Sequence, residues 1–172
     1  MSTVATPAVA HLVRLRIAHS VHAYEAPDRH GRARAERPGY GVEAAAALGI
    51  DPDRMGKTLI VEVDGALAAA VVPVARSLDL KALATALGAR RADLAEPGVA
   101  ERATGSAIGG ISPLGMRRHL PVVIDETLLA GPTVFVSAGR RGLQLELDPA
   151  DLVTATGAVV AAVGRTSSGS SM

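Results

Sequence analysis

The feature that most restricts the fold is a two-residue turn between two apolar segments. Asp64 and Gly65 separate the apolar residues 59–63 from the largely apolar residues 66–74. An Asp-Gly pair readily takes the positive φ angles that a tight hairpin turn requires. We therefore predict an antiparallel pair of strands near the middle of the chain.

Helix and strand signals alternate on both sides of this hairpin. Thr6-Pro7, Asp79 and Asp148-Pro149 are typical helix starts, because Thr and Asp side chains cap N-termini and Pro suits the first turn. Residues 143–147 alternate apolar and polar side chains, as a half-buried strand does. The other predicted helices are 42–48 and 97–103, the other predicted strands are 19–25, 92–95, 122–124 and 133–136, residues 27–41 are a surface loop, and residues 158–163 form a strand or a helix. The pattern predicts an α/β (α+β) protein with a mixed sheet.

Length and composition exclude several classes of protein. The 172 residues contain no repeat and no linker long enough to separate domains, which predicts one domain. Cysteine is absent, which excludes disulfides, thiolate metal sites and a protein thiol nucleophile. The net charge of +1 and the three aromatic residues argue against a DNA-coating protein or a base-stacking surface. No apolar run is long enough for a membrane helix, and residues 1–10 do not resemble a signal peptide, so we expect a cytoplasmic protein.

Lysine is rare in this chain, and its two positions are therefore of interest. Arginine supplies 16 of the 18 basic residues, and lysine occurs only at Lys57 and Lys81. A lysine differs from an arginine as a compact, mobile charge whose pKa can shift. Each lysine is equally compatible with a functional role and with an ordinary surface position.

Standard catalytic and nucleotide-binding motifs are absent, but three local groups could carry chemistry. Lys57 and Thr58 precede a strand, where an ammonium and a hydroxyl could reach a polar ligand, although a plain surface lysine is the simpler reading. Gly109 and Gly110 would let a backbone approach a ligand closely, or form a connecting loop. The third group is arginine-rich and comprises Ser137, Arg140 and Arg141 with a second patch at Arg117, Arg118 and His119. These residues alone indicate an anion-binding cleft or a solvated surface.

The order of these motifs resembles the YbaK family of trans-editing aminoacyl-tRNA deacylases, and specifically its members that act on Cys-tRNA(Pro). The matching segments are TPAV, HAYE, LGIDPDRMGKTLIVEVDG, LDLKALATALGARR, ATGSAIGGISPLG, RRHLPVVID and VFVSAGRRGLQLEL, in the family's order over most of residues 6–160. The KTL step, GGISPLG and the Ser-x-Gly-Arg-Arg-Gly-Leu turn are specific only in combination.

The resemblance implies one domain over residues 1–164, with helices around a mixed, partly barrel-like sheet, and a disordered tail at 165–172. It also implies an enzyme without a cofactor or metal that deacylates mischarged tRNA. A separate editing site is needed because one pocket discriminates amino acids of similar size poorly. Mischarged aminoacyl-tRNA is the implied substrate, and prolyl-tRNA synthetase is a transient partner.

The family's functional residues carry over to Lys57 and Gly109 as catalytic positions. The implied substrate contacts are Tyr24, Thr58, Ser137 and Gly110, and Arg117, Arg118, Arg140 and Arg141 are candidate tRNA contacts. Gln144 replaces an aspartate that is frequent in the family, which leaves an acid–base role at this position open. Ser106 and Ala107 replace a tyrosine and a leucine, which could widen the pocket.

The mechanism that the resemblance implies uses the substrate's own thiol. In cysteinyl-tRNA this thiol lies beside the ester carbonyl, and intramolecular attack has a high effective concentration. Lys57 would bind a phosphate or stabilise the oxyanion. The alternatives are a deacylase for Ala-tRNA(Pro), a non-catalytic tRNA- or nucleotide-binding module, and a purely structural domain.

Overall fold

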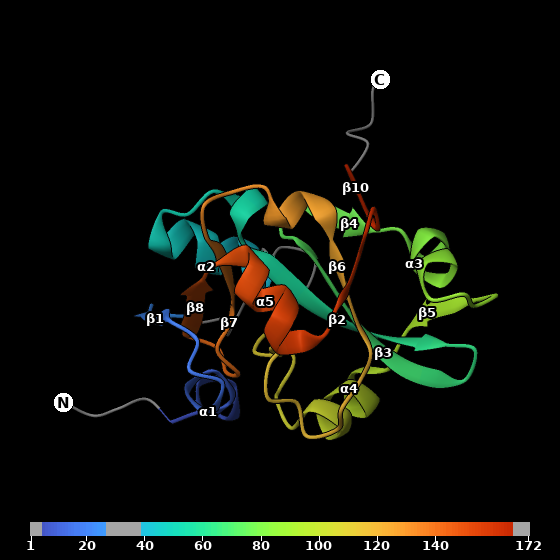
Figure 1. Cartoon of the computed structure of the whole chain (residues 1–172), viewed down its shortest axis with the longest axis horizontal. Helices are drawn as coiled ribbons and strands as arrows, with labels where there is room; N and C mark the ends of the chain where they lie inside the picture. The colour runs from blue at the N-terminus through green and yellow to red at the C-terminus, as the bar shows by residue number, and fades with distance from the viewer. Residues whose placement is uncertain (1–4, 27–38, 167–172) are drawn as a thin grey trace, which may run out of the picture.

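The computed structural model describes residues 5–26 and 39–166, and its largest element is a five-stranded mixed sheet (Figure 1). Its strand order is β5 (Ala92–Leu94), β2 (Gly56–Val63), β3 (Ala66–Pro73), β6 (Val122–Asp125) and β9 (Val159–Ala161). The predicted hairpin is confirmed: β2 pairs antiparallel with β3 from Gly56↔Pro73 to Val63↔Ala66, and Asp64 and Gly65 have φ angles of 48° and 84°. The β3–β6 and β6–β9 pairs are parallel, which makes the sheet mixed.

A second sheet of three antiparallel strands has the order β1 (His19–Ala23), β8 (Leu143–Leu147) and β7 (Val134–Ser137). Across it, His22, Gln144 and Ser137 lie in one row. An isolated parallel bridge joins Met55, just before β2, to Phe135 in β7. A third pair joins β4 (Arg76–Leu78) to β10 (Gly164–Thr166). These ladders remain separate in the described residues, so the sheets do not close into the partly barrel-like arrangement that the resemblance suggested.

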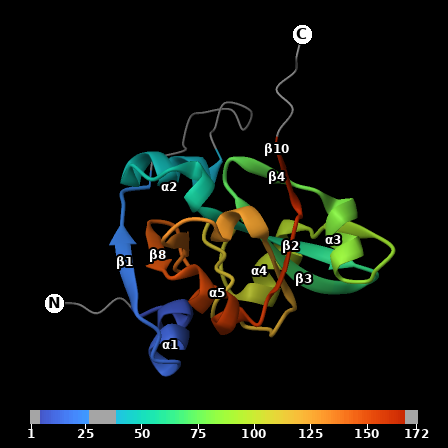
Figure 2. The same cartoon turned by 45° about the horizontal axis from the view of Figure 1, so that its top comes forward.

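Five α-helices cover the sheets, as Figures 1 and 2 show from two directions: α1 (Pro7–Arg14), α2 (Tyr40–Leu48), α3 (Leu80–Ala86), α4 (Pro97–Thr104) and α5 (Pro149–Thr156). Two short 3-10 helices, η2 (Pro52–Arg54) and η3 (Glu126–Leu129), complete the elements. The predicted caps are confirmed, because Thr6, Asp79 and Asp148 each accept a hydrogen bond from a backbone N–H of the helix that follows.

The apolar core lies on both faces of the large sheet. One cluster joins Ile60, Val71 and Ile124 of this sheet to strands β7 and β8 and to helices α1 and α5. The cluster on the opposite face packs residues such as Val72 against Leu83 of α3. This arrangement confirms a single mixed α/β domain. No helix of the described chain is long and apolar enough to cross a membrane.

Several boundaries differ from the prediction. Helix α2 begins at Tyr40, inside the predicted loop 27–41, of which residues 27–38 lie outside the described part. Strand β2 begins at Gly56, so Lys57 and Thr58 lie within the strand rather than before it. Residues 159–161 are a strand. Strand β10 extends the folded chain to Thr166, two residues past the predicted boundary, because its residues pair with β4.

Candidate active site

A cavity of about 340 Å³ lies between the start of α2, the first half of β2, the β5–α4 connection and the loop that follows α4. It brings together five of the residues that the sequence singled out: Lys57, Thr58, Gly109, Ser137 and Gln144. These residues come from β2, the loop after α4, β7 and β8, so only the tertiary fold brings them together. The volume is at the small end of the range for small-molecule sites, about 300–1,000 Å³.

Lys57 is half-buried at this cavity and makes no hydrogen bond or ion pair with the described residues. Burial lowers the pKa of its ammonium below the ordinary value of 10.5, because the charged form loses hydration. No carboxylate is among the described residues that line the cavity. The wall therefore presents a positive charge that an anionic group would stabilise.

Two buried oxygen atoms at the cavity also lack partners. The Thr58 hydroxyl and the Gln144 side-chain carbonyl are buried without a hydrogen bond to any described residue. Buried polar groups of native proteins are nearly always paired, and an unpaired one costs about 1–3 kcal/mol. Both groups are thus suited to hydrogen-bond a ligand in the cavity.

The turn at Gly109 and Gly110 requires glycine at both positions. Gly109 has a φ of 93°, and an added Cβ would lie 2.5 Å from the Tyr40 ring. A Cβ on Gly110 would lie 2.7 Å from Cα of Arg140 and 2.8 Å from the backbone nitrogen of Arg141. The loop after α4 therefore packs directly on the backbone of the turn that follows β7.

Ser137 holds this turn through its hydroxyl, which donates to the carbonyl of Gly110 at 3.0 Å and accepts from the N–H of Gly139 at 3.1 Å. Ser106 adds a parallel link, because its hydroxyl donates to the carbonyl of Gly139 at 2.9 Å. Ser106 and Ala107 do not line the cavity, so their small side chains do not widen it directly. Ser137 lines the cavity and at the same time fixes the Gly109 backbone.

Tyr40 is a residue at this site that the sequence reasoning missed. It lines the cavity next to Gly109. The guanidinium of Arg141 lies 4.8 Å from the centre of its ring, and one nitrogen of that group is 3.5 Å from a carboxylate oxygen of Glu43. The three-residue spacing of Tyr40 and Glu43 within one helix was the available signal, but the neighbouring glycines indicated a loop.

The remaining predicted residues lie elsewhere. Tyr24 packs against the cluster that contains Met55 and Phe135 and does not line the cavity. Arg140 is exposed beside the Gly110 turn. Arg117 and Arg118 line a second cavity.

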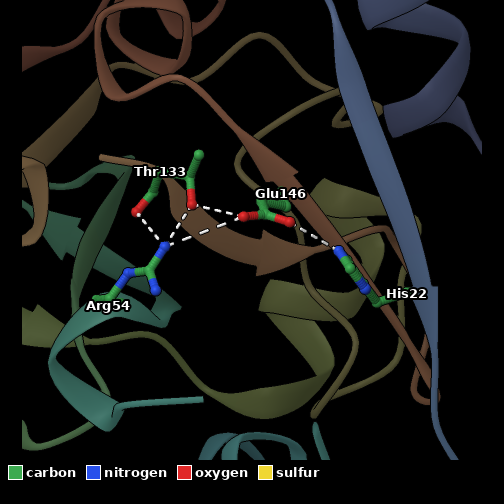
Figure 3. A network of polar contacts seen from close by, with 4 residues as sticks. All are labelled: His22, Arg54, Thr133 and Glu146. Carbon is green, nitrogen blue, oxygen red and sulfur yellow. Dashed lines mark hydrogen bonds and ion pairs between the residues drawn. The ribbon is translucent and has the colours of Figure 1, made fainter. Parts of the chain in front are cut away.

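A polar network borders the row of His22, Gln144 and Ser137 (Figure 3). His22 Nε2 lies 2.9 Å from one oxygen of Glu146, and the Thr133 hydroxyl donates to the other oxygen at 2.6 Å. Arg54 donates to the Thr133 hydroxyl. These contacts, the hydrogen bond from Thr133 first, lower the pKa of Glu146 against the opposing effect of burial. The network fixes β1, β7 and β8 to η2, which leads into the strand that carries Lys57.

Three comparisons relate the chain to known proteins. Residues 37–155 match the sequence model described as "Aminoacyl-tRNA editing domain". A protein of Enterococcus faecalis, EbsC, named as a candidate Cys-tRNA(Pro)/Cys-tRNA(Cys) deacylase, is 37% identical over 65% of this chain and 69% of its own length. A proline–tRNA ligase of Moorella thermoacetica is 35% identical over 60% of this chain and 18% of the ligase. The crystal structure of a candidate trans-editing enzyme for prolyl-tRNA synthetase superimposes with a TM-score of 0.77 at 25% identity, over 95% of this chain and 99% of that chain.

Proposed function

Because the chain belongs to the aminoacyl-tRNA editing domain family, we propose that it removes cysteine from mischarged Cys-tRNA(Pro) as a separate, trans-acting deacylase. The name of the Enterococcus faecalis relative supports this substrate. Cysteine and proline are of similar size, and a single pocket discriminates such pairs by only about 10–200-fold. A second enzyme that hydrolyses the wrong product would then keep cysteine out of proline codons.

The observation that carries the proposal is the unpaired ammonium of Lys57, which lines one small cavity together with the Gly109 turn. The end of a charged tRNA is an amino acid esterified to a ribose, with a phosphate on its far side. Both the phosphate and the oxyanion that forms during ester cleavage are negative and would be stabilised by Lys57. The unpaired oxygens of Thr58 and Gln144 would bind the amine or the ribose hydroxyl of this substrate.

In the proposed reaction the thiol of the bound cysteinyl group is the nucleophile. Its sulfur bonds to the ester carbonyl carbon, the bond from that carbon to the ribose oxygen breaks, and the thiol proton goes to the released ribose hydroxyl. The product is a cyclic thioester of cysteine, which water then opens. The chain contains no cysteine, and the Ser137 hydroxyl is engaged with Gly110 and Gly139, so a substrate nucleophile is the simplest source.

A panel of charged tRNAs tests this proposal. The purified protein should deacylate Cys-tRNA(Pro) in the absence of added metal and leave Ser-tRNA(Pro) and Pro-tRNA(Pro) intact, because serine and proline offer no thiol. Survival of Cys-tRNA(Pro) at high enzyme concentration would contradict the proposed activity. Rapid loss of Ser-tRNA(Pro) would show that activated water, not the substrate thiol, attacks the ester.

Ala-tRNA(Pro) is the second candidate substrate. Gln144 favours it, because a neutral amide stands at the cavity where a carboxylate is frequent in related sequences. Alanine carries no nucleophile, so its removal would need water. Faster loss of Ala-tRNA(Pro) than of Cys-tRNA(Pro) in the same panel would replace the first proposal with this one, whereas RNA binding without any deacylation would indicate a non-catalytic module.

We also propose prolyl-tRNA synthetase as a transient partner. A chain with a formal net charge of +1 releases few counterions on binding RNA, so its intrinsic affinity for tRNA should be modest. Recruitment by the synthetase would raise the local concentration of the mischarged product. Addition of the synthetase should therefore lower the KM for Cys-tRNA(Pro) without changing kcat.

A further inference from the structure

A second cavity, also of about 340 Å³, lies where α1, the loop of residues 113–120 and the C-terminal end of α5 meet. Figure 1 shows α1 and this end of α5 on the same side of the molecule. Its basic lining residues are His11, Arg14, Arg117, Arg118 and His119, and no carboxylate is among its described lining residues. We call it the basic cavity. The whole chain has 18 Lys and Arg against 17 Asp and Glu, so this is a local concentration of positive charge.

The three arginines of the basic cavity are accessible to an anion. Each is exposed, and none forms an ion pair within the described chain, whereas Arg54 and Arg141 are paired with glutamates. A guanidinium has five N–H donors in a planar fork that matches two oxygens of one phosphate. The site can therefore bind a phosphate without first breaking a salt bridge.

His11 orients one of these arginines. Its Nε2 lies 3.0 Å from the carbonyl oxygen of Ala155 in α5, and its Nδ1 lies 3.1 Å from Nη2 of Arg14. A carbonyl can only accept, so Nε2 carries the proton and Nδ1 accepts from Arg14. One donor of the Arg14 guanidinium is thus fixed, and the others remain for a ligand.

We propose that the basic cavity binds the phosphodiester backbone of the substrate RNA, as a second contact beyond the cavity that holds the aminoacyl end. The inference rests on the proposed function, since it assigns the surface along which the tRNA leaves that cavity. A concave wall of low dielectric concentrates the field of the arginines on a group the size of a phosphate. A convex acidic surface of a protein would fit such a cavity less well.

The loop after α4 connects the two cavities. Ile108, Gly109 and Ile111 line the first cavity, and the same loop continues from Pro113 to Leu120 along the basic cavity. At Gly115, with a φ of 67°, an added Cβ would lie 2.4 Å from the carbonyl carbon of Pro7, so the loop packs closely on α1. An RNA bound at both cavities would therefore meet contacts at a fixed spacing.

A purely structural role for the arginines is the competing explanation. The backbone N–H groups of Arg117 and Arg118 donate to the carbonyls of Thr104 and Ala103, at 3.0 and 2.9 Å, and so close the end of α4. Positive side chains at helix C-termini also favour the helix dipole. The test must therefore separate RNA affinity from stability.

The test compares two adjacent arginine pairs. The Arg117→Gln/Arg118→Gln variant and the Arg14→Gln variant alter the basic cavity, and Arg90→Gln/Arg91→Gln removes the same charge as the former from residues that line neither cavity. The probe is labelled, uncharged tRNA(Pro), whose affinity is measured by fluorescence anisotropy at several salt concentrations, with melting temperatures in parallel. We expect the Arg117/Arg118 pair to weaken binding about tenfold and to make the slope of log K against log salt shallower by about 1.5. The Arg90/Arg91 pair should change neither quantity.

Further arms separate the remaining outcomes. Deacylation of full-length Cys-tRNA(Pro) should lose more efficiency in the Arg117/Arg118 variant than deacylation of a cysteinylated 3′-terminal trinucleotide does. Equal affinities and salt slopes in the two arginine pairs would overturn the inference, and so would a fall in melting temperature alone. Inorganic phosphate at equal ionic strength should not displace the tRNA; displacement at low concentration would mean that the site binds free phosphate instead. Uncharged tRNA needs no turnover, so arginine-dependent binding without deacylation would refute the proposed function and leave this site standing.

Discussion

Lys57 is the residue on which the candidate chemistry depends most directly. It supplies a positive charge to a cavity whose other described lining residues are neutral. We predict that Lys57→Ala lowers kcat/KM for Cys-tRNA(Pro) by about 10²–10³-fold, the usual cost of losing a stabilising group at a developing oxyanion. Steady-state kinetics decides its role, because an oxyanion contact lowers kcat and a phosphate contact raises KM. The control is Lys81→Ala on the exposed face of α3, which should retain full activity.

The same burial predicts how activity changes with pH. Because desolvation lowers the pKa of Lys57 below 10.5, its ammonium deprotonates at a lower pH than that of an exposed lysine. The charged form is the active one, so the rate should fall as pH rises through this lowered pKa. A pH–rate profile, corrected for spontaneous ester hydrolysis, measures the effect. The Lys57→Arg variant, whose guanidinium stays charged, should show no such decline; parallel profiles would assign the titration to another group.

Gly109 and Gly110 differ in what an added side chain would meet. A methyl group on Gly109 meets the Tyr40 ring, which can move, whereas one on Gly110 meets the backbone of Arg140 and Arg141. We predict that Gly109→Ala costs about 1–2 kcal/mol of unfolding free energy, mainly from its positive φ. Gly110→Ala should cost about 3 kcal/mol. Urea unfolding measures both, and Gly109→Ala combined with Tyr40→Leu should recover part of the loss, whereas no recovery would show that φ strain alone is responsible.

At the scale of the elements, local signals predicted what local chemistry determines. Capping side chains at Thr6, Asp79 and Asp148 and the turn at Asp64-Gly65 each act within a few residues, and the structure confirms them. The start of α2 was missed because its N-cap, Gly39, makes no side-chain hydrogen bond. Strands β4 and β10 were missed because three-residue strands carry no periodicity and pair only across the length of the chain.

The candidate site shows the same division. The resemblance selected Lys57, Thr58, Gly109, Ser137 and Gln144, and the fold places all five on one cavity. The partners of these residues depend on tertiary packing, such as the engagement of Ser137 with Gly110. Tyr40 reaches the cavity because α2 folds over the Gly109 turn, which no local pattern of residues predicts.

The network around Glu146 gives a prediction for the smaller sheet. Glu146 links β8 to His22 of β1 and to Thr133 beside β7, and its pKa is lowered in the folded state. A carboxylate with a depressed pKa stabilises the fold above its unfolded pKa, and this contribution is lost as pH falls through the folded value. Glu146→Gln should therefore cost about 1 kcal/mol near pH 7 and little below about pH 4, since the pair is partly exposed. Urea unfolding at the two pH values measures the difference, and an equal loss at both would refute the electrostatic cause.

For the whole molecule, Asp125 connects the end of the central sheet to the C-terminal segment. It is 1% exposed and accepts hydrogen bonds from Thr127 and from the backbone N–H groups of Val163 and Gly164, at 2.9 and 2.7 Å from the latter two. Burial alone would raise its pKa, but these hydrogen bonds outweigh burial and hold the pKa below 3.8. The carboxylate therefore stabilises the fold above the unfolded pKa of about 3.9, and its contribution disappears as pH falls through the folded value.

This connection predicts where the chain can be shortened. A chain that ends at residue 166 keeps β10 and both backbone donors of Asp125, whereas one that ends at residue 162 removes them and leaves a buried carboxylate short of partners. We expect the shorter chain to lose about 3 kcal/mol or more of unfolding free energy at pH 7, because an uncompensated buried charge costs that much. Adding Asp125→Asn to the shorter chain should recover part of the loss, since the amide carries no charge, whereas the same substitution in the longer chain should destabilise it. If Asp125→Asn destabilises both chains equally, Val163 and Gly164 are not the groups that hold the carboxylate, and the C-terminal segment stabilises the domain only through its strand pairing with β4.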